Sequence, residues 1–465
     1  MDAAGMISWN PDLRRWGKPH YLAIVEALAE DVRTGRLAVG TRLPPQRALA
    51  EALDLNFTTV ARGYVEAQKR GLVEGRVGQG TFVTDPAGRE RAAPPAHRGA
   101  VDFTMNLPPE PDDPALIARM RAGYAALAAE LPNLLRYQGF GGTEHDKAAA
   151  LRWLSRRGVI ATSDRLLICP GTHSALGAIL DTVAQPGDAI CVERLTYPGI
   201  RALAARRGLQ LVDLPIDEDG VDPEAFAAAC TRAAPKAIYL NPLLQNPTTA
   251  TIKRGRRQAI IEVARRYAVT IIEDDAYAFV CPTPPPSFAT LAPEITYYIA
   301  GLAKCLGAGL RIAYLVAPNA RASLPLAAAL RATAVMASPL TTSLATRWID
   351  DGTAEAVLGF IRTESRNRQS IAARLLPPEL VQADPHGFHL WLSLPEGWTR
   401  SAFASQARAV GLGVVGSDAF CTSGKPPEAA RVCLGGLATR AEITQALEVM
   451  AHVLEQSPAL ASAYI

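Results

Sequence analysis

Beyond about residue 100, amphipathic helical patterns alternate with short runs of apolar and β-branched residues. Such runs, bounded by polar segments, predict buried strands, and they occur at 166–169, 189–192, 237–240, 269–273, 297–300 and 312–316. The segments between them are rich in Ala and Leu and predict helices. This alternation is typical of an α/β domain with a mostly parallel sheet.

The first 84 residues have a different pattern. Residues 21–34 carry apolar side chains on one helical face, and a second helix is predicted to open at the prolines 44 and 45. A third helix is expected from about 58 to 70, after a short turn at 54–56. Two short strands around a glycine-rich tip follow at 72–83. Helix, tight turn and helix is the geometry that places a helix in the DNA major groove, and the hairpin would form a wing.

Residues 85–100 separate these two patterns. They are rich in Pro, Gly and charged residues and lack apolar periodicity, which predicts a linker. The expected organisation is therefore one domain at 1–84, a linker at 85–100 and a second domain at 101–455.

Composition narrows the class of protein. The chain has 465 residues, 49% of them hydrophobic, which is enough to form the cores of two or three domains. The net charge of +3 is too small to establish nucleic-acid binding by itself. Seven scattered cysteines without a CxxC pair indicate reduced thiols in a cytoplasmic protein and give no metal site. Neither a signal peptide nor a membrane-spanning run is expected.

The stretch 299–311 carries the most informative chemistry. Lys304 stands there among small and apolar residues, where burial would lower the pKa of its amine and make it nucleophilic. Arg311 follows two glycines, which let the backbone approach a ligand closely. An amine for a carbonyl and a fixed cation for a phosphate suit pyridoxal 5′-phosphate (PLP). A buried lysine beside a turn explains the same stretch.

Other segments offer groups for such a ligand. Residues 171–172 stand between a predicted strand and helix, where backbone N–H groups bind phosphate. Tyr197 suits stacking on a flat heterocycle, and Asn246 sits in a proline-rigidified loop. Asp274 ends a buried strand, and Arg431 lies in a predicted strand where its planar fork can hold a carboxylate.

Each group also has a structural explanation. Tyr197 could serve only as an aromatic residue of the core. Arg431 could pair with a carboxylate that has a structural role. Asp274 fits a turn residue at a strand end, with Asp275 as its rival, although only Asp274 keeps the Asp-x-x-Tyr spacing to Tyr277.

The order Gly-Thr, Tyr, Asn-Pro, Asp-x-x-Tyr, Lys and Arg makes residues 101–455 resemble a fold-type I aminotransferase domain. The resemblance implies a large α/β subdomain at about 115–325 and a small C-terminal α+β subdomain at about 326–455. It implies that Lys304 forms the internal aldimine with PLP. The other implied cofactor ligands are Gly171, Thr172 and Arg311 at the phosphate, Tyr197 on the ring, Asp274 at the pyridinium nitrogen, and Asn246 and Tyr277 at the phenolic oxygen.

Three further roles are implied only by this resemblance. Arg431 would clamp the carboxylate of an amino-acid ligand, with Asn106 near that carboxylate. Tyr137 would reach the phosphate bound in the neighbouring subunit of a homodimer. Tyr137 also fits a core aromatic residue, and Asn106 has the least specific match.

Residues 17–84 resemble the winged helix-turn-helix of GntR-type bacterial regulators. The matching motifs are Arg42-Leu43-Pro44, Arg47 after the proline pair, Thr58-Thr59-Val60 and the stretch 78–83. The implied contacts with a double-stranded DNA operator come from Arg47, Thr58, Thr59, Arg62 and Arg76, with Gly78 near the minor groove. Each side chain taken singly also fits an ordinary solvated residue. The fusion of the two domains resembles the MocR subfamily of GntR regulators.

The chain departs from these family patterns at a few positions. Phe57 stands where the GntR family usually has an arginine, which removes one expected DNA contact. Gly301, Ala303 and Pro170 stand where aminotransferases often have serines. Each missing hydroxyl forfeits a hydrogen bond to a charged phosphate, roughly 1.5–3 kcal/mol, so weaker PLP binding is expected.

The resemblance leaves functions of different classes open. In the first, a transcriptional regulator senses PLP, or an amino acid or amine that forms an external aldimine and releases Lys304, and its winged domains move on DNA. In the second, the chain is an active aminotransferase with an auxiliary DNA-binding domain; in a third, it is a DNA-binding protein whose cofactor fold is inactive. The attached winged domain favours the first. A homodimer is expected, for which the family offers a head-to-tail arrangement.

Overall fold

The computed structural model describes residues 9–17, 19–38, 40–76, 80–84 and 101–456. The chain divides into two compact units, Met1–Gly99 (unit 1) and Ala100–Ile465 (unit 2). The predicted linker at 85–100 lies outside the described residues. Within the described ranges, no helix has both the length and the apolar character needed to cross a membrane.

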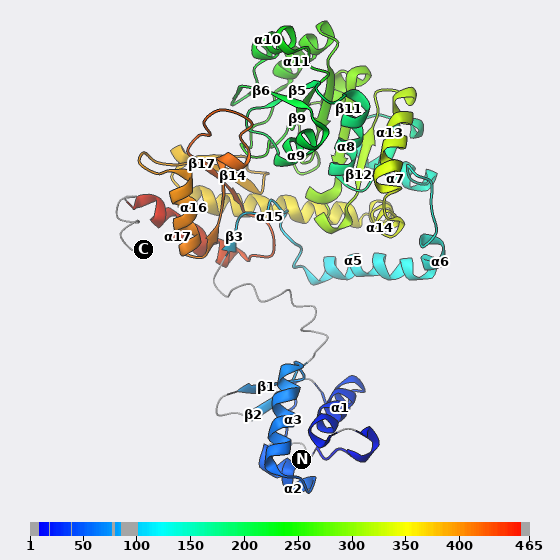
Figure 1. The fold of residues 1–465 in the computed structure, drawn as a ribbon, viewed down its shortest axis with the longest axis vertical. Helices are drawn as coiled ribbons and strands as arrows, with labels where there is room; N and C mark the ends of the chain where they lie inside the picture. Colours follow the sequence, from blue (N-terminus) through cyan, green and yellow to red (C-terminus); the bar gives the residue numbers. More distant parts are fainter. Residues whose placement is uncertain (1–8, 18, 39, 77–79, 85–100, 457–465) are drawn as a thin grey trace. The chain divides into compact units, whose positions relative to one another are not determined.

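Unit 1 is a small helical domain with a hairpin (Figure 1). Its elements are the 3-10 turn η1 (Arg14–Trp16), α1 (His20–Arg33), α2 (Gln46–Ala52), α3 (Phe57–Lys69), β1 (Val73–Arg76) and β2 (Gly80–Val83). The side chain of Asn56 caps α3 by accepting a hydrogen bond from the backbone N–H of Thr58 at 2.9 Å. Ile24, Leu49 and Val60 meet in one core. The predicted helices and antiparallel wing strands are therefore confirmed.

A seven-stranded mixed sheet organises unit 2. The strand order is β4-β12-β11-β10-β9-β5-β6, and only β12 runs antiparallel to its neighbours. The strands are β4 (Leu166–Cys169), β5 (Ala189–Glu193), β6 (Gln210–Leu214), β9 (Ala237–Leu240), β10 (Thr270–Asp274), β11 (Thr296–Gly301) and β12 (Ala313–Val316). Six of these strands match the predicted apolar runs within one residue, whereas β6 was not among those runs. The strand directions confirm the mostly parallel α/β prediction.

Helices cover both faces of this sheet. The helices of unit 2 are α5 (Pro114–Ala126), α6 (Leu131–Leu134), α7 (Glu144–Ser155), α8 (Thr172–Val183), α9 (Pro198–Arg207), α10 (Pro223–Ala233), α11 (Arg254–Arg266), α12 (Phe288–Leu291), α13 (Ala320–Ala334), α14 (Pro339–Asp350), α15 (Thr353–Leu375), α16 (Arg400–Ala409) and α17 (Arg440–Glu455). Ile272 faces the core formed with α8, α9 and α13, whereas Ile271 faces the opposite core with α10 and α11. Both faces of the central strands are thus buried, which explains their continuous apolar character.

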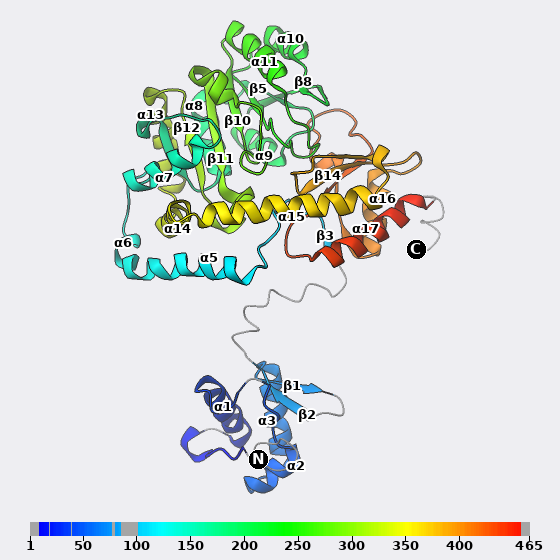
Figure 2. The same ribbon diagram turned by 180° about the vertical axis from the view of Figure 1, so that it is seen from behind.

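A second, antiparallel sheet lies towards the C-terminus. Its order is β13 (Val381–Ala383), β14 (His389–Ser393), β17 (Ala429–Cys433) and β16 (Val415–Gly416). Beside it, β3 (Val101–Asp102) pairs with β15 (Leu412–Gly413), while β7 (Ile216–Asp217) and β8 (Gly220–Val221) form a separate hairpin. The long helix α15 spans both sheets (Figures 1 and 2): Leu358 packs in the large core and Ile371 in the small one.

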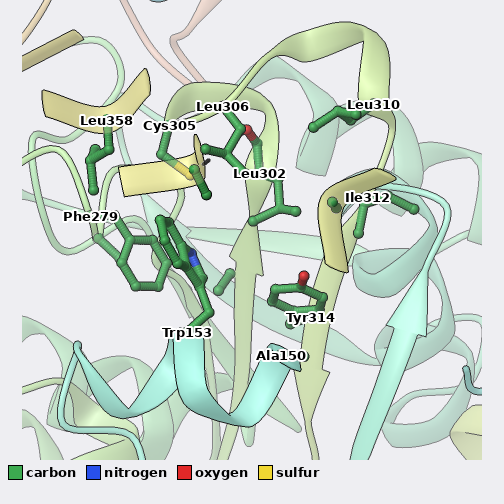
Figure 3. Packing of buried hydrophobic residues seen from close by; sticks show 14 of the residues in the cluster. Ala150, Trp153, Phe279, Leu302, Cys305, Leu306, Leu310, Ile312, Tyr314 and Leu358 are labelled. Carbon is green, nitrogen blue, oxygen red and sulfur yellow. Dashed lines mark hydrogen bonds between the residues drawn. The ribbon is translucent and has the colours of Figure 1, made fainter. Parts of the chain in front are cut away.

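Short 3-10 turns complete unit 2, and one of them carries the lysine. They are η2 (Leu127–Glu130), η3 (Ser163–Arg165), η4 (Pro293–Ile295), η5 (Leu302–Lys304), η6 (Ala308–Leu310), η7 (Pro378–Leu380) and η8 (Ser417–Ala419). Leu302, Leu306 and Leu310 are buried in the cluster of Figure 3, beside Trp153 and Tyr314. These apolar anchors fix the loop from both sides of Lys304.

Candidate functional site

One cavity of about 180 Å³ lies at the carboxyl ends of the parallel strands of unit 2. Loops after β4, β5, β9, β10 and β11 contribute its walls, because parallel strands end at the same edge of the sheet. The predicted residues that line it are Gly171, Thr172, Tyr197, Asn246, Asp274, Tyr277, Lys304 and Arg311. They come from segments separated by up to 140 residues.

Lys304 ends the turn η5, three residues after β11, and lines this cavity. Burial lowers the pKa of its amine to about 8, from an ordinary value of 10.5. Its Nζ donates a hydrogen bond to the backbone carbonyl of Asn106. The site therefore holds a desolvated amine with a much larger neutral fraction near pH 7 than a surface lysine has.

Asp274 ends β10 and lines the same cavity. Its Oδ2 accepts a hydrogen bond from the hydroxyl of Tyr239 at 2.9 Å, while its Oδ1 is buried without a partner among the described residues. Burial raises the pKa of Asp274 to about 7. One oxygen is thus held in place, and the other remains available to a donor within the cavity.

Gly171, Thr172 and Arg311 form the end of the cavity next to α8. Gly171 has φ +85°, and a Cβ there would lie 2.9 Å from the guanidinium of Arg311. Arg311 itself adopts a left-handed conformation with φ 52°. Helix α8 begins without a side-chain cap. The first backbone N–H groups of α8 and the guanidinium of Arg311 therefore both lie at this end of the cavity. This arrangement suits an anion.

The predicted residues Arg431 and Asn106 do not line this cavity, but they contact Asn246 and Tyr277, which do. The Nη1 of Arg431 donates to Oδ1 of Asn246 at 2.7 Å, and its Nη2 donates to the carbonyl of Thr104 at 2.6 Å. The Nε of Arg431 is buried without a partner among the described residues. Asn106 donates its amide to the hydroxyl of Tyr277 at 2.7 Å. The guanidinium therefore keeps a donor for a further acceptor.

Two predicted aromatic residues differ in position. Tyr197 caps α9, and its ring packs edge-on against His173, with centroids 6.4 Å apart. Burial raises the pKa of its phenol. Tyr137, by contrast, is 80% exposed and does not line the cavity.

Sequence reasoning missed three polar residues that line the cavity: His173, Tyr239 and Asn241. Asn241 donates to the carbonyl of Asp274 at 2.7 Å and accepts from the backbone N–H of Asn246 at 2.8 Å. It joins the two loops that present the carboxylate and the amide. The available signal was a polar hydroxyl at Tyr239 within an otherwise apolar strand, followed at once by an asparagine.

Among the predicted DNA-binding residues of unit 1, Thr58, Thr59 and Arg62 lie on α3, and Arg47 lies on α2. Arg47 and Arg62 are exposed, and Arg62 stacks over the ring of Tyr21 at 4.1 Å. Thr58 donates its hydroxyl to Asn56 at 2.8 Å, and Thr59 is half-buried. Arg76 ends β1, and Gly78 lies outside the described residues.

Two family models match the chain in the same order as the two units. "Bacterial regulatory proteins, gntR family" covers residues 20–83, and "Aminotransferase class I and II" covers residues 99–450. The chain is a MocR-type regulator and belongs to the class I and II aminotransferase family. This regulator therefore combines a GntR helix-turn-helix domain with an aminotransferase domain.

Relatives share this arrangement over most of their length. The regulator is 29% identical to the HTH-type transcriptional regulator YdeF of Bacillus subtilis, over 97% of both chains. It is 28% identical to the probable rhizopine catabolism regulatory protein MocR of Rhizobium meliloti, over 64% of this chain and 66% of that protein. The fold matches that of LysN, an α-aminoadipate aminotransferase of Thermus thermophilus, with a TM-score of 0.69 and 22% identity, over 82% of this chain and 97% of LysN.

Proposed function

We propose that this regulator binds PLP at Lys304 and senses an amino acid or amine there, so that ligand binding changes how its winged domains bind operator DNA. The observation that carries the proposal is the convergence of Lys304, the free oxygen of Asp274 and the Gly171–Arg311 end on one cavity. We place this function in the cytoplasm, where bacterial DNA is transcribed.

The donor set fits PLP. A protonated ring nitrogen would donate a hydrogen bond to Oδ1 of Asp274, which has no partner among the described residues. A phosphate would fit beside Gly171, in the space that a Cβ at this position would occupy. Tyr197 offers a ring for stacking, and Asn246 and Tyr277 offer polar groups for the phenolic oxygen. When bound, PLP supplies an aldehyde carbon and an electron-withdrawing ring. This chain supplies the amine of Lys304, the carboxylate of Asp274 for the ring and the guanidinium of Arg311 for the phosphate.

Two hydrogen bonds connect the site to the segment that follows β3. Lys304 donates to the carbonyl of Asn106, and Arg431 donates to that of Thr104. Both carbonyls lie just after β3, which directly follows the predicted linker in sequence. A ligand carboxylate that takes the donors of Arg431 competes with Thr104, and loss of the Lys304 contact frees Asn106. We propose that this short segment transmits ligand binding towards the winged domain.

The test of cofactor binding uses the full chain. PLP added to wild type is expected to give visible absorbance, and borohydride treatment followed by mass spectrometry should locate the adduct on Lys304. Lys304→Ala should lose both signals, whereas Lys253→Ala, a solvent-exposed lysine outside the cavity, should keep them. Colourless wild type with no adduct would refute the proposal.

An active aminotransferase is the second candidate, because Lys304, Asp274 and Tyr277 line one cavity. Steady-state transamination with a panel of amino acids and 2-oxoglutarate, beside a gel shift on the DNA upstream of the chain's own gene, separates the two. Fast turnover without DNA binding would favour the enzyme. DNA binding that responds to an amino acid or amine, with slow turnover, would favour the regulator.

We also propose a homodimer, in which Tyr137 reaches the partner subunit. Large apolar side chains are exposed between α5 and the segment after α6, namely Tyr124 (69%), Leu135 (70%) and Tyr137 (80%). A second copy would cover them. Sedimentation of wild type should give a dimer, and Leu135→Asp should weaken it; a monomeric wild type would contradict this proposal, and the head-to-tail option with it.

A further inference from the structure

An apolar ring is exposed at the start of the helix that is expected to read DNA. Phe57 is the first residue of α3, and 45% of its surface is exposed. Within the described part of unit 1, the other large apolar side chain with comparable exposure is Val65, two turns further along α3. The N-terminal residues of the second helix in a helix-turn-helix are those that contact base edges. Phe57 therefore occupies a position that contacts bases in such domains, and it is not part of the core.

The surroundings of Phe57 favour an apolar contact at this point. The guanidinium of Arg47 lies 5.9 Å from the centre of the ring, within the range of a cation–π contact. The neighbouring Thr58 has its hydroxyl hydrogen and its backbone N–H directed to Asn56. The hydroxyl of Thr58 therefore already donates a hydrogen bond, and the ring of Phe57 carries no polar group. A hollow adjoins the ring, and its lining comprises Arg47, Ala50, Glu51, Asp54, Leu55, Asn56 and Phe57.

We infer that Phe57 reads the C5-methyl group of a thymine in each operator half-site, and that its ring also holds the guanidinium of Arg47 for the adjoining phosphate or base. Thymine is the base that presents a methyl group in the major groove, and phenylalanine is among the side chains that contact it. An arginine at this position would instead read guanine through its bidentate fork. The inference rests on the proposed DNA-binding function.

The first experiment selects operator duplexes from a random-sequence pool with the full chain and with Phe57→Arg. Wild type is expected to select a thymine at one position of each half-site, and Phe57→Arg is expected to select guanine there. Val65→Ala is the matched control on the same helix and should select the wild-type sequence. If no sequence is enriched by wild type, the DNA-binding function fails together with this inference.

The second experiment needs only wild type, so it does not depend on the folding of a variant. Replacing the selected thymine by uracil in one half-site removes one methyl group and leaves the base pair intact. Wild type is expected to bind the uracil duplex about fourfold more weakly, equivalent to about 0.8 kcal/mol for one buried methyl group. Phe57→Ala should bind both duplexes equally. If wild type binds the selected sequence specifically, but its affinity is unchanged when any of the thymines is replaced by uracil, the inference is wrong. The proposed DNA-binding function would still hold.

Discussion

Tyr239 donates its hydroxyl hydrogen to Oδ2 of Asp274 at 2.9 Å, across the adjacent parallel strands β9 and β10. This contact holds Oδ2 and leaves Oδ1 without a partner among the described residues, on a side chain that lines the cavity. The hydroxyl is fully buried, so nothing in the solvent replaces it.

We therefore expect Tyr239→Phe to weaken PLP binding about tenfold to a hundredfold, since a hydrogen bond to a charged group contributes roughly 1.5–3 kcal/mol. Titration of the apo-protein with PLP, followed by absorbance, measures the change. Tyr314→Phe is a matched control, because Tyr314 is equally buried in β12 but does not line the cavity. Equal affinities of Tyr239→Phe and wild type would show that this contact does not orient the carboxylate.

The second prediction concerns the hydroxyl groups that the phosphate end lacks. A Cβ at residue 301 would lie 2.4 Å from Oγ1 of Thr172, so Gly301→Ser is expected to weaken PLP binding by displacing that hydroxyl. Ala303→Ser adds a hydroxyl at the cavity wall and is expected to tighten binding up to about tenfold.

The double variant Gly301→Ser/Thr172→Ala moves the hydroxyl from one residue to the other. It should recover most of the affinity that Gly301→Ser loses, measured in the same titration. If Gly301→Ser and Ala303→Ser both leave the affinity unchanged, missing hydroxyls do not limit PLP binding in this chain.

The third prediction is a pH dependence set by Lys304. Burial places the pKa of its amine at about 8, so roughly one amine in ten is neutral at pH 7. Because only the neutral amine attacks an aldehyde, the rate of PLP attachment should rise about tenfold per pH unit below 7 and level off above about 8. Stopped-flow absorbance measures this rate. A rate that continues to rise up to pH 10 would indicate an ordinary lysine.

The fourth prediction concerns stability without cofactor. The pKa of Asp274 is about 7 in the folded chain and 3.8 ordinarily, because burial disfavours the charge. The unfolded chain therefore releases this proton first, and folding stability falls as the pH rises from about 4 to 7. Asp274→Asn removes that penalty, and we expect it to raise the free energy of unfolding by a few kcal/mol at pH 8 but little near pH 4. Urea unfolding of apo-protein at both pH values tests this, and a variant less stable than wild type at pH 8 would contradict it.

The fifth prediction addresses the carboxylate end. Arg431→Lys keeps the charge but loses the planar fork and its free Nε donor. We expect amino acids to bind the PLP-loaded variant about tenfold to a hundredfold more weakly, with amines that lack a carboxylate little affected. Spectral titration with an amino acid and its decarboxylated amine gives the comparison, in which the amine is the internal control. An equal loss for both ligands would mean that Arg431 acts through Asn246 rather than on the carboxylate.

The sequence by itself determined the fold and the main chemical groups of this regulator. Periodicity is a local property, so the strands at 166–169 and 237–240 were predicted with the bounds that the structure has. Lys304 and Asp274 were recognisable because an isolated charge among apolar residues, and a carboxylate at a strand end, are visible in the chain itself.

Only the tertiary structure decided which of these groups meet. Tyr239 lies 35 residues from Asp274, and Arg431 lies 185 residues from Asn246, so no local pattern relates them. The parallel strand register brings the first pair together, and the packing of the C-terminal sheet against the large core brings the second. The close approach of Thr172, at the start of α8, to Gly301, at the end of β11, likewise depends on close packing, which sequence spacing does not contain.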